Sequence, residues 1–167
     1  LTYSILSGPA HGIVSLSGNE ATYTPESNYN GADSFTFKVS DGTLDSNMAT
    51  ISLTISPMND GPLAVNDIAS TDEDTTLTIA KPTLLSNDLD VDGDPLSLIN
   101  VSNPINGLVV ISGSNVVFTP DPNFNDTASF NYTVSDGDLT DTATVTVIVN
   151  PVNDAPVAND GSATTSE

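Results

Sequence analysis

The chain has 167 residues, of which 37% are hydrophobic, so it is long enough to bury a core in one ordinary domain or two small ones. Only two basic residues, Lys38 and Lys81, stand against 22 acidic residues, and the formal net charge is −20. Such a charge repels nucleic acid and anionic lipid and favours a multivalent cation as a partner. We therefore expect no nucleic-acid binding and, because the apolar runs are strand-sized, no membrane insertion.

The chain repeats itself. Residues 1–42 match residues 96–137 at a constant offset of 95, and residues 49–62 match residues 143–156 after a slip of one residue. The repeated unit is about 94 residues long, which is the usual size of a β-sandwich domain. A third copy begins at residue 156.

These matches predict the domain organisation. We expect residues 1–57 to be the C-terminal part of one repeat, 58–61 a linker, 62–151 a complete repeat, 152–155 a second linker and 156–167 the start of a third repeat. The linkers are bordered by proline, so their backbone is stiff compared with a Gly/Ser tether. The simplest interpretation is a fragment of a long tandem array. The alternative is head-to-tail self-association, in which the tail of one molecule docks as a strand on the first domain of the next.

The elements expected along the chain are all strands. Residues 129–134 alternate apolar and polar side chains, which places Phe130, Tyr132 and Val134 on one face, and residues 34–39 do the same in the first repeat. Further strands are expected near 49–56, 75–79, 96–101, 107–112, 115–119 and 143–150. No apolar period of 3.6 residues persists, so the predicted fold class is all-β, built as two-sheet sandwiches.

An acidic loop, NDLDVDGDP at 87–95, places Asp88, Asp90, Asp92 and Asp94 at every second position. An EF-hand loop counted from Asp88 requires a bidentate glutamate at its twelfth position, which is Ile99 here. No helical segment is expected beside the loop either, so a self-contained EF-hand is disfavoured. A solvated Asp/Gly turn is one remaining interpretation. The other is half of a metal site, because clustered carboxylates repel one another strongly unless a cation joins them.

Four spaced motifs together resemble a known family. They are a Pro-bounded linker with NDGP or NDAP, DVDGD after the second strand, YTPESNYNGADSF before the penultimate strand, and VSDG after it. The combination resembles cadherin-like tandem repeats of bacterial extracellular adhesins, and it covers essentially the whole chain. The resemblance implies a cadherin/Ig-like Greek-key sandwich with about seven strands in a complete repeat. It also implies Ca²⁺ bound between successive repeats.

The resemblance also implies a set of calcium ligands at two junctions. Asn59 and Asp60 in the first linker would be joined by Asp33 of the first repeat and by a group from the complete repeat: Asp88, Asp90, Asp92, Asp94 and Asp136. At the second junction, Asn153 and Asp154 would be joined by Glu73 and by Asp126. The first repeat has no counterpart of Glu73, and Asp126 lies in NDTAS rather than in GADS.

The sequence offers little for catalysis. His11 is the single histidine and its counterpart in the repeat is Asn106, so a turn role explains it and a Ser-His-Asp triad is disfavoured. We expect a non-enzymatic, calcium-binding spacer of a large extracellular or cell-surface bacterial protein, with neighbouring repeats of the same chain as its partners. The alternative is a carbohydrate-binding module of a polysaccharide-associated protein, with Tyr29 and Phe124 as the aromatic residues that could stack on sugar.

Overall fold

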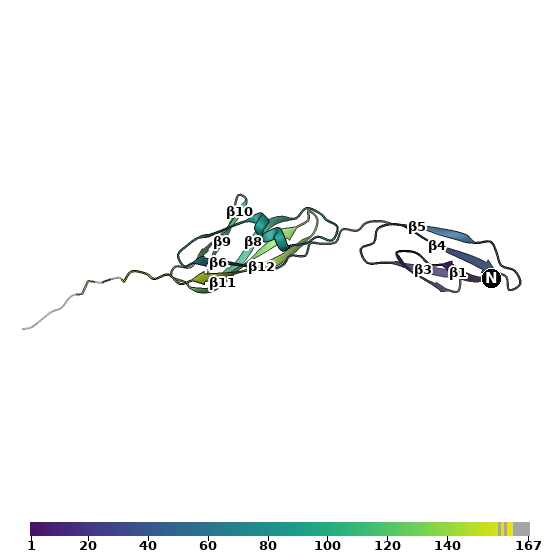
Figure 1. Ribbon diagram of the computed structural model, residues 1–167, viewed down its shortest axis with the longest axis horizontal. Helices are drawn as coiled ribbons and strands as arrows, with labels where there is room; N and C mark the ends of the chain where they lie inside the picture. The colour runs from purple at the N-terminus through teal and green to yellow at the C-terminus, as the bar shows by residue number, and fades with distance from the viewer. Residues whose placement is uncertain (157, 159, 162–167) are drawn as a thin grey trace, which may run out of the picture. The chain divides into compact units, whose positions relative to one another are not determined.

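The computed structural model describes residues 1–156, 158, 160 and 161, and it divides into two compact units (Figure 1). Unit 1 comprises Leu1–Asp60 and unit 2 begins at Gly61. Strands make up nearly all of the regular structure in both units, so the predicted all-β fold class is confirmed. Most of the segment 156–167, where a third repeat is predicted to start, lies outside the described residues.

Unit 1 contains five antiparallel strands in two sheets. One sheet has the order β1-β4-β5 and the other pairs β2 with β3. The strands are β1 (Thr2–Ser7), β2 (Gly12–Ser17), β3 (Glu20–Pro25), β4 (Gly31–Ser40) and β5 (Ala49–Ile55). Phe35, on the predicted inward face of β4, is the most buried apolar side chain of this unit.

Unit 2 contains seven strands in two sheets, in the orders β6-β12-β11-β8 and β7-β10-β9. The strands are β6 (Asp67–Asp72), β7 (Leu77–Ala80), β8 (Ser97–Ile105), β9 (Gly107–Ser112), β10 (Asn115–Pro120), β11 (Asp126–Ser135) and β12 (Thr140–Asn150). All neighbours are antiparallel except β6, which runs parallel to β12 at the edge of its sheet. The seven-stranded sandwich predicted for the complete repeat is therefore present.

The core of unit 2 lies between its two sheets. The alternation of β11 places Phe130, Tyr132 and Val134 inward with no exposed surface, and the ring of Phe118 on β10 stacks on Phe130 with centroids 5.7 Å apart. Gly107 lets β9 approach this ring, because a Cβ at that position would lie 2.5 Å from Phe118. The repeated glycine at the start of β9 is thus a packing requirement.

One expectation about the acidic loop is wrong. A short helical segment, α1 (Lys81–Leu84) followed by the 3₁₀ turn η1 (Leu85–Asn87), leads directly into Asp88. Pro82 in the first turn favours this start, because its fixed φ suits a helix and its missing N–H is not needed there. The segment is too short to show a helical apolar period, which explains why the sequence pattern did not reveal it. Its buried member, Leu84, packs into the core of unit 2.

Candidate metal centre

The acidic loop joins η1 to β8 and is held by its own backbone. Leu89 and Leu63 form an isolated antiparallel bridge, with N–H to carbonyl distances of 2.7 and 3.1 Å, which ties the loop to the first residues of unit 2. Gly93 has φ +81°, a left-handed conformation that glycine adopts without strain. The loop is therefore tied to unit 2 at Leu89, and glycine suits its turn at residue 93.

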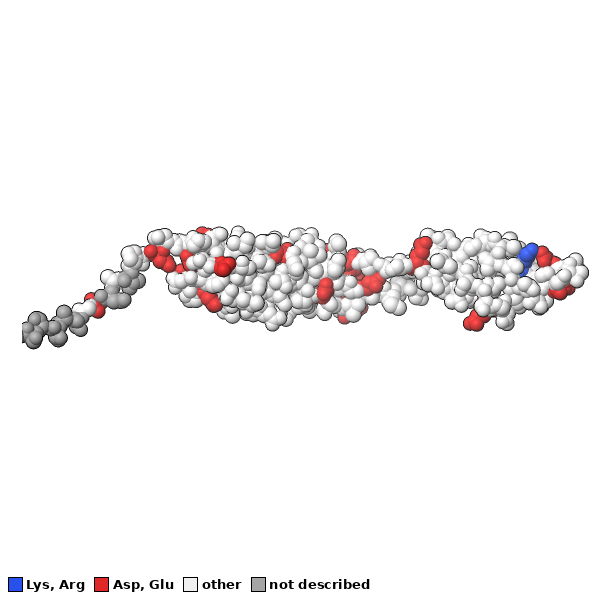
Figure 2. Space-filling model, turned by 90° about the horizontal axis from the view of Figure 1, so that it is seen from below, with Lys and Arg blue, Asp and Glu red and all other residues white. Residues whose placement is uncertain are grey.

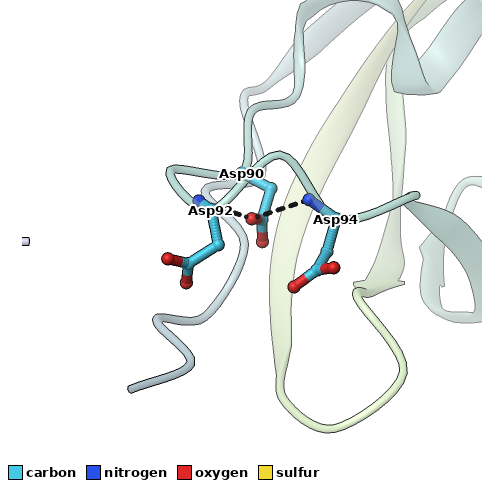
Figure 3. A group of neighbouring side chains, drawn as sticks. All are labelled: Asp90, Asp92 and Asp94. Carbon is cyan, nitrogen blue, oxygen red and sulfur yellow. Dashed lines mark hydrogen bonds between the residues drawn. The ribbon is translucent and has the colours of Figure 1, made fainter. Parts of the chain in front are cut away.

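Three carboxylates of this loop converge. Asp90 Oδ1 accepts the N–H groups of Asp92 at 2.9 Å and of Asp94 at 3.2 Å, and Figure 3 shows the three side chains leaving the loop on the same side. One carboxylate oxygen from each residue lies within 4.8 Å of the others. The second oxygen of Asp90, Oδ2, is buried and has no hydrogen-bond partner among the described residues.

The three carboxylates repel one another. At about 4 Å, two like unit charges repel by about 1 kcal/mol in water and by about 4 kcal/mol near a protein surface. The two lysines of the chain lie on other elements, β4 and α1, and Figure 2 shows acidic side chains gathered near the ends of unit 2. Oxygen ligands without His or Cys suit a hard ion such as Ca²⁺.

Asp88 belongs to a different environment. Its carboxylate is 7% exposed and turns into unit 2, where Oδ1 accepts the N–H of Val65 at 2.7 Å and the hydroxyl of Tyr132 at 3.0 Å. The four evenly spaced aspartates are therefore divided by the structure. The carboxylates of Asp90, Asp92 and Asp94 lie close together, whereas that of Asp88 accepts hydrogen bonds inside unit 2.

Sequence reasoning did not find the neighbours of Asp88. Asp67 at the start of β6 and Asn87 at the end of η1 meet there, with Asn87 Nδ2 donating to Asp67 Oδ1 at 3.2 Å. Burial, and then the charge of Asp88, raise the pKa of Asp67 above its usual value, and they outweigh the hydroxyl of Tyr132 and the amide of Asn87, which lower it. Asp67 Oδ2 and Asn87 Oδ1 are buried without a hydrogen-bond partner among the described residues. No spacing in the sequence could have signalled this group, because its members come from two segments that look like polar turns.

Asp136, predicted as a ligand, forms a turn. Its Oδ1 accepts the N–H groups of Asp138 and Leu139, each at 2.7 Å, and Asp41 makes the same kind of turn in unit 1. Aspartate commonly caps its own backbone in this way. The repeated VSDG motif is explained by this turn, and a metal role for Asp136 stays a prediction.

Glu73, predicted as a ligand of the second junction, anchors the end of unit 2. It is 5% exposed, its Oε1 accepts the N–H of Val152, and its Oε2 accepts Asn125 Nδ2 at 3.0 Å. The backbone N–H of Glu73 donates to the carbonyl of Asn150 at 2.9 Å. These contacts fix the chain where it leaves β12, and they give Glu73 a structural role whether or not a metal binds.

The linker residues lie at the surface. Asn59, Asp60, Asn153 and Asp154 are all exposed, and Asn153 Nδ2 donates to the carbonyl of Asp154 at 3.2 Å. Their predicted metal roles, like that of Asp126 at the start of β11, stay predictions.

Asp33 is surrounded by donors inside unit 1. Its Oδ1 accepts the N–H groups of Ala10 and Ser34, and its Oδ2 accepts the N–H of His11 and the hydroxyl of Tyr23. A carboxylate has about four lone-pair positions, and all four are used. This arrangement favours a structural role for Asp33 over the predicted role as a metal ligand.

The pH dependence of unit 1 should reveal this structural role. Partial burial raises the pKa of Asp33, but the hydrogen bonds from Ala10, His11, Ser34 and Tyr23 outweigh it and lower the pKa from 3.8 to about 2. Because the folded pKa lies below the unfolded one, the stabilisation is complete above pH 3.8 and is lost as the pH falls towards 2. Urea unfolding of unit 1 followed by NMR should show this loss, and Asp33→Asn should remove it. If the stability of unit 1 fell just as steeply with pH in Asp33→Asn as in the wild type, the structural role of Asp33 would be contradicted.

A comparison with known protein families matches residues 1–54 and 59–148 to the family described as "Bacterial Ig domain". The chain belongs to this family. Bacterial Ig domains are typically non-catalytic and are found in extracellular or surface proteins. No helix in the described part of the chain is long and apolar enough to cross a membrane. The comparison with curated proteins gave no significant match.

Among solved structures, this bacterial Ig chain is similar to parts of larger proteins. The endo-fucoidan hydrolases MfFcnA4 and MfFcnA9 of glycoside hydrolase family 107 are 22% and 16% identical, with TM-scores of 0.37 and 0.34. The alignments cover 91% and 88% of this chain but only 24% and 27% of those chains. A chimeric titin Z1Z2 is 11% identical, with a TM-score of 0.27, and 89% of this chain and 80% of that chain are covered. Likenesses at these scores carry no argument about function.

The residues considered for catalysis or sugar binding have structural contacts in this bacterial Ig chain. The ring of His11 stacks on Tyr29 with centroids 4.1 Å apart, and its Nδ1 lies 3.6 Å from Glu26. The hydroxyl of Tyr29 donates to the carbonyl of Ala32 at 2.7 Å, and Phe124 packs against the core of unit 2. These contacts explain the aromatic residues as packing at the ends of the sheets.

Proposed function

We propose that the chain is a non-enzymatic spacer segment of an extracellular bacterial protein, and that unit 2 binds Ca²⁺ through the loop of Asp90, Asp92 and Asp94. The observation that carries the proposal is the buried, unpartnered Oδ2 of Asp90 beside two further carboxylates within 4.8 Å. An acceptor left without a donor in this position is costly unless a cation or a proton joins it. The family, whose domains are typically non-catalytic and extracellular, supports the spacer role.

The donor set fits calcium. Ca²⁺ takes six to eight oxygen ligands in flexible geometry, whereas Mg²⁺ demands a near-ideal octahedron and keeps several waters. Three carboxylates on one turn supply part of such a set, and carbonyl groups, water and the predicted linker ligands Asn59 and Asp60 could supply the rest. When bound, the ion supplies positive charge that offsets the mutual repulsion of the loop.

The place where the loop is attached supports the spacer role. Asp90 follows Leu89, whose bridge to Leu63 holds the segment that enters unit 2 from the linker. An ion that orders the loop would therefore also order the entry of the chain into unit 2. By mass action, free Ca²⁺ at 100 times its dissociation constant should stabilise unit 2 by about 2.7 kcal/mol.

The test is a calcium titration by calorimetry on the wild-type chain and on Asp90→Asn. Asparagine retains an oxygen that can accept the two loop N–H groups, and it replaces the unpartnered Oδ2 with an amide. We expect Asp90→Asn to weaken calcium binding at least about tenfold, which corresponds to about 1.4 kcal/mol. Glu20→Gln, an exposed residue of unit 1, is the control because it removes the same charge without touching the loop.

Two outcomes would count against the proposal. Identical isotherms for the wild type and Asp90→Asn would show that the loop is a solvated turn and does not bind Ca²⁺ through Asp90. If Asp90→Asn abolished binding but X-ray scattering in solution did not differ between excess Ca²⁺ and excess chelator, the calcium site would stand and the spacer role would fail.

A further inference from the structure

Several aspartates of the chain are followed directly by glycine. They are Asp41, Asp60, Asp92, Asp136 and Asp160. In such a pair the backbone nitrogen of glycine can attack the side-chain carboxyl carbon of aspartate, because glycine has no side chain to hinder the approach. The product is a succinimide ring, which water reopens either to aspartate or to isoaspartate. Asp41, Asp92 and Asp136 lie in turns of the two sandwiches, where hydrogen bonding of the reacting groups decides whether the ring can close.

The pairs in the two VSDG turns are held in their native form. Asp136 Oδ1 accepts two backbone N–H groups of its own turn, each at 2.7 Å, and the N–H of Gly137 donates to Ser135 Oγ at 3.1 Å. Asp41 and Gly42 make the equivalent hydrogen bonds in unit 1. Ring closure would have to break the bonds of both reacting groups, and this adds to the barrier.

The pair in the acidic loop is held differently. Asp90 Oδ1 accepts the N–H of Asp92 at 2.9 Å and that of Asp94 at 3.2 Å, which are the groups on either side of Gly93 (Figure 3). The N–H of Gly93 itself has no hydrogen-bond partner among the described residues. Nothing lies within 4 Å of the place where a Cβ of Gly93 would be, and Asp92 is exposed. The attacking nitrogen of this pair is therefore available.

We propose that Asp92–Gly93 is a site of spontaneous covalent modification, at which Asp92 becomes isoaspartate when the loop holds no cation. The Gly93 nitrogen attacks Asp92 Cγ and forms a C–N bond, and one carboxyl oxygen leaves as water with the N–H proton and a proton from solvent. Water then adds to the main-chain carbonyl carbon of Asp92 and breaks its bond to the Gly93 nitrogen. That carbon becomes a carboxylate, the nitrogen regains its proton, and a proton returns to solvent. The reaction needs no oxidant, reductant or second reactant.

Isoaspartate at residue 92 would dismantle the turn. The main chain would run through Cβ and Cγ of this residue, so it would be longer by one C–C bond, about 1.5 Å. The added bond lies between Asp90 and Asp94, so the N–H of Asp94 would lose its present position against Asp90 Oδ1. The three carboxylates, which now lie within 4.8 Å of one another, would separate. The modified loop should therefore no longer hold an ion.

The role of calcium in this modification rests on the proposed function, in which Asp92 is one of the calcium ligands. A carboxyl oxygen that is bound to Ca²⁺ cannot leave as water, and a loop that is ordered around the ion cannot bend to close the ring. Bound Ca²⁺ would therefore protect the loop. Isoaspartate would accumulate only in molecules that are depleted of the ion, and each event would remove one calcium site.

The first experiment incubates the full chain at neutral pH with excess chelator, with excess Ca²⁺, or with chelator in guanidinium chloride. Peptide mapping with fragmentation that distinguishes the two isomers then gives the rate at each Asp–Gly pair. We expect Asp92 to react with chelator at close to its rate in the denatured chain. Excess Ca²⁺ should slow it at least about tenfold, a change of about 1.4 kcal/mol in the barrier. At Asp41 and Asp136, folding alone should slow the reaction at least about tenfold.

The second experiment connects the modification with calcium binding. Titrations of samples aged with chelator should show a stoichiometry that falls in proportion to the isoaspartate at residue 92. An isoaspartyl methyltransferase with S-adenosylmethionine, which returns isoaspartate to the ring, should restore part of the binding. Asp92→Glu is the matched variant, because it keeps the charge but would have to close a larger ring. It should form no isoaspartate at this position, and its calcium binding should be the same before and after ageing.

Three outcomes would overturn the inference. They are the absence of isoaspartate at residue 92 after incubation with chelator, rates at Asp41 and Asp136 equal to that at Asp92 in the folded chain, and equal rates at Asp92 with and without Ca²⁺. The calcium titration of the unaged wild type separates such a failure from a failure of the proposed function. If it still shows the binding that Asp90→Asn weakens, the calcium site stands and only the modification is refuted.

Discussion

Phe118→Ala is expected to lower the free energy of unfolding of unit 2 by about 3–5 kcal/mol, the usual cost of removing a fully buried phenylalanine. The ring of Phe118 has no exposed surface and stacks on Phe130. Its edge also fills the space above Gly107, so the backbone of β9 would have to move to close the cavity. Urea unfolding followed by the amide signals of β10, β11 and β12 would measure the change.

The control for this prediction is Ile68→Ala on β6 of the same unit. Ile68 is 77% exposed, so its truncation should change the stability by no more than about 0.5 kcal/mol. A loss below about 1 kcal/mol in Phe118→Ala would mean that this part of the core is loosely packed. That result would contradict the close packing of Phe118 against Phe130 and Gly107 in the core of unit 2.

The sequence predicted the central strands because their side chains alternate. In β11 the period of two places Phe130 and Val134 inward, and the structure buries both completely. The edge strand β6 could not be found in this way, since its one large apolar residue, Ile68, points outward while the small or polar Ala69 and Thr71 point inward. Edge strands are poorly marked because packing demands less of them than of central strands.

Part of the acidic group in the loop could also be predicted from the alternation of side chains along an extended segment. The spacing of Asp90 and Asp92 predicts one shared face, and the structure groups them with Asp94. It could not be predicted that Asp88 turns inward, because this depends on Tyr132, whose hydroxyl arrives from β11, 44 residues along the chain. Local spacing indicates which residues can act together, but burial decides which of them do.

Asp88→Ala is expected to destabilise unit 2 by about 1–2 kcal/mol, because a partly buried donor would lose its acceptor. The donor that would lose its acceptor is the N–H of Val65, which donates to Asp88 Oδ1 at 2.7 Å. The hydroxyl of Tyr132 would keep an acceptor, because the carbonyl of Val65 lies 2.9 Å away. Asp88→Asn should cost less, since asparagine can retain the acceptor for Val65.

Asp67→Asn should change stability in the opposite direction. Burial, and then the charge of Asp88, raise the pKa of Asp67, and its Oδ2 is buried without a partner among the described residues. Its ionised form is therefore disfavoured in the folded state. We expect the neutral amide to stabilise unit 2 by about 1 kcal/mol at pH 7, because it removes a charge that partial burial and the neighbouring Asp88 disfavour.

The pH dependence separates this explanation from a simple change in packing. Because the folded pKa of Asp67 lies above the unfolded value of 3.8, the folded state binds more protons than the unfolded state over the interval between the two values. Stability contributed by this group is therefore present below pH 3.8 and is lost as the pH rises through the interval. The advantage of Asp67→Asn over the wild type should accordingly be small in acid and grow towards pH 7. An advantage that is constant with pH would show that the charge of Asp67 is not its cause, and that the two carboxylates do not oppose each other at this site.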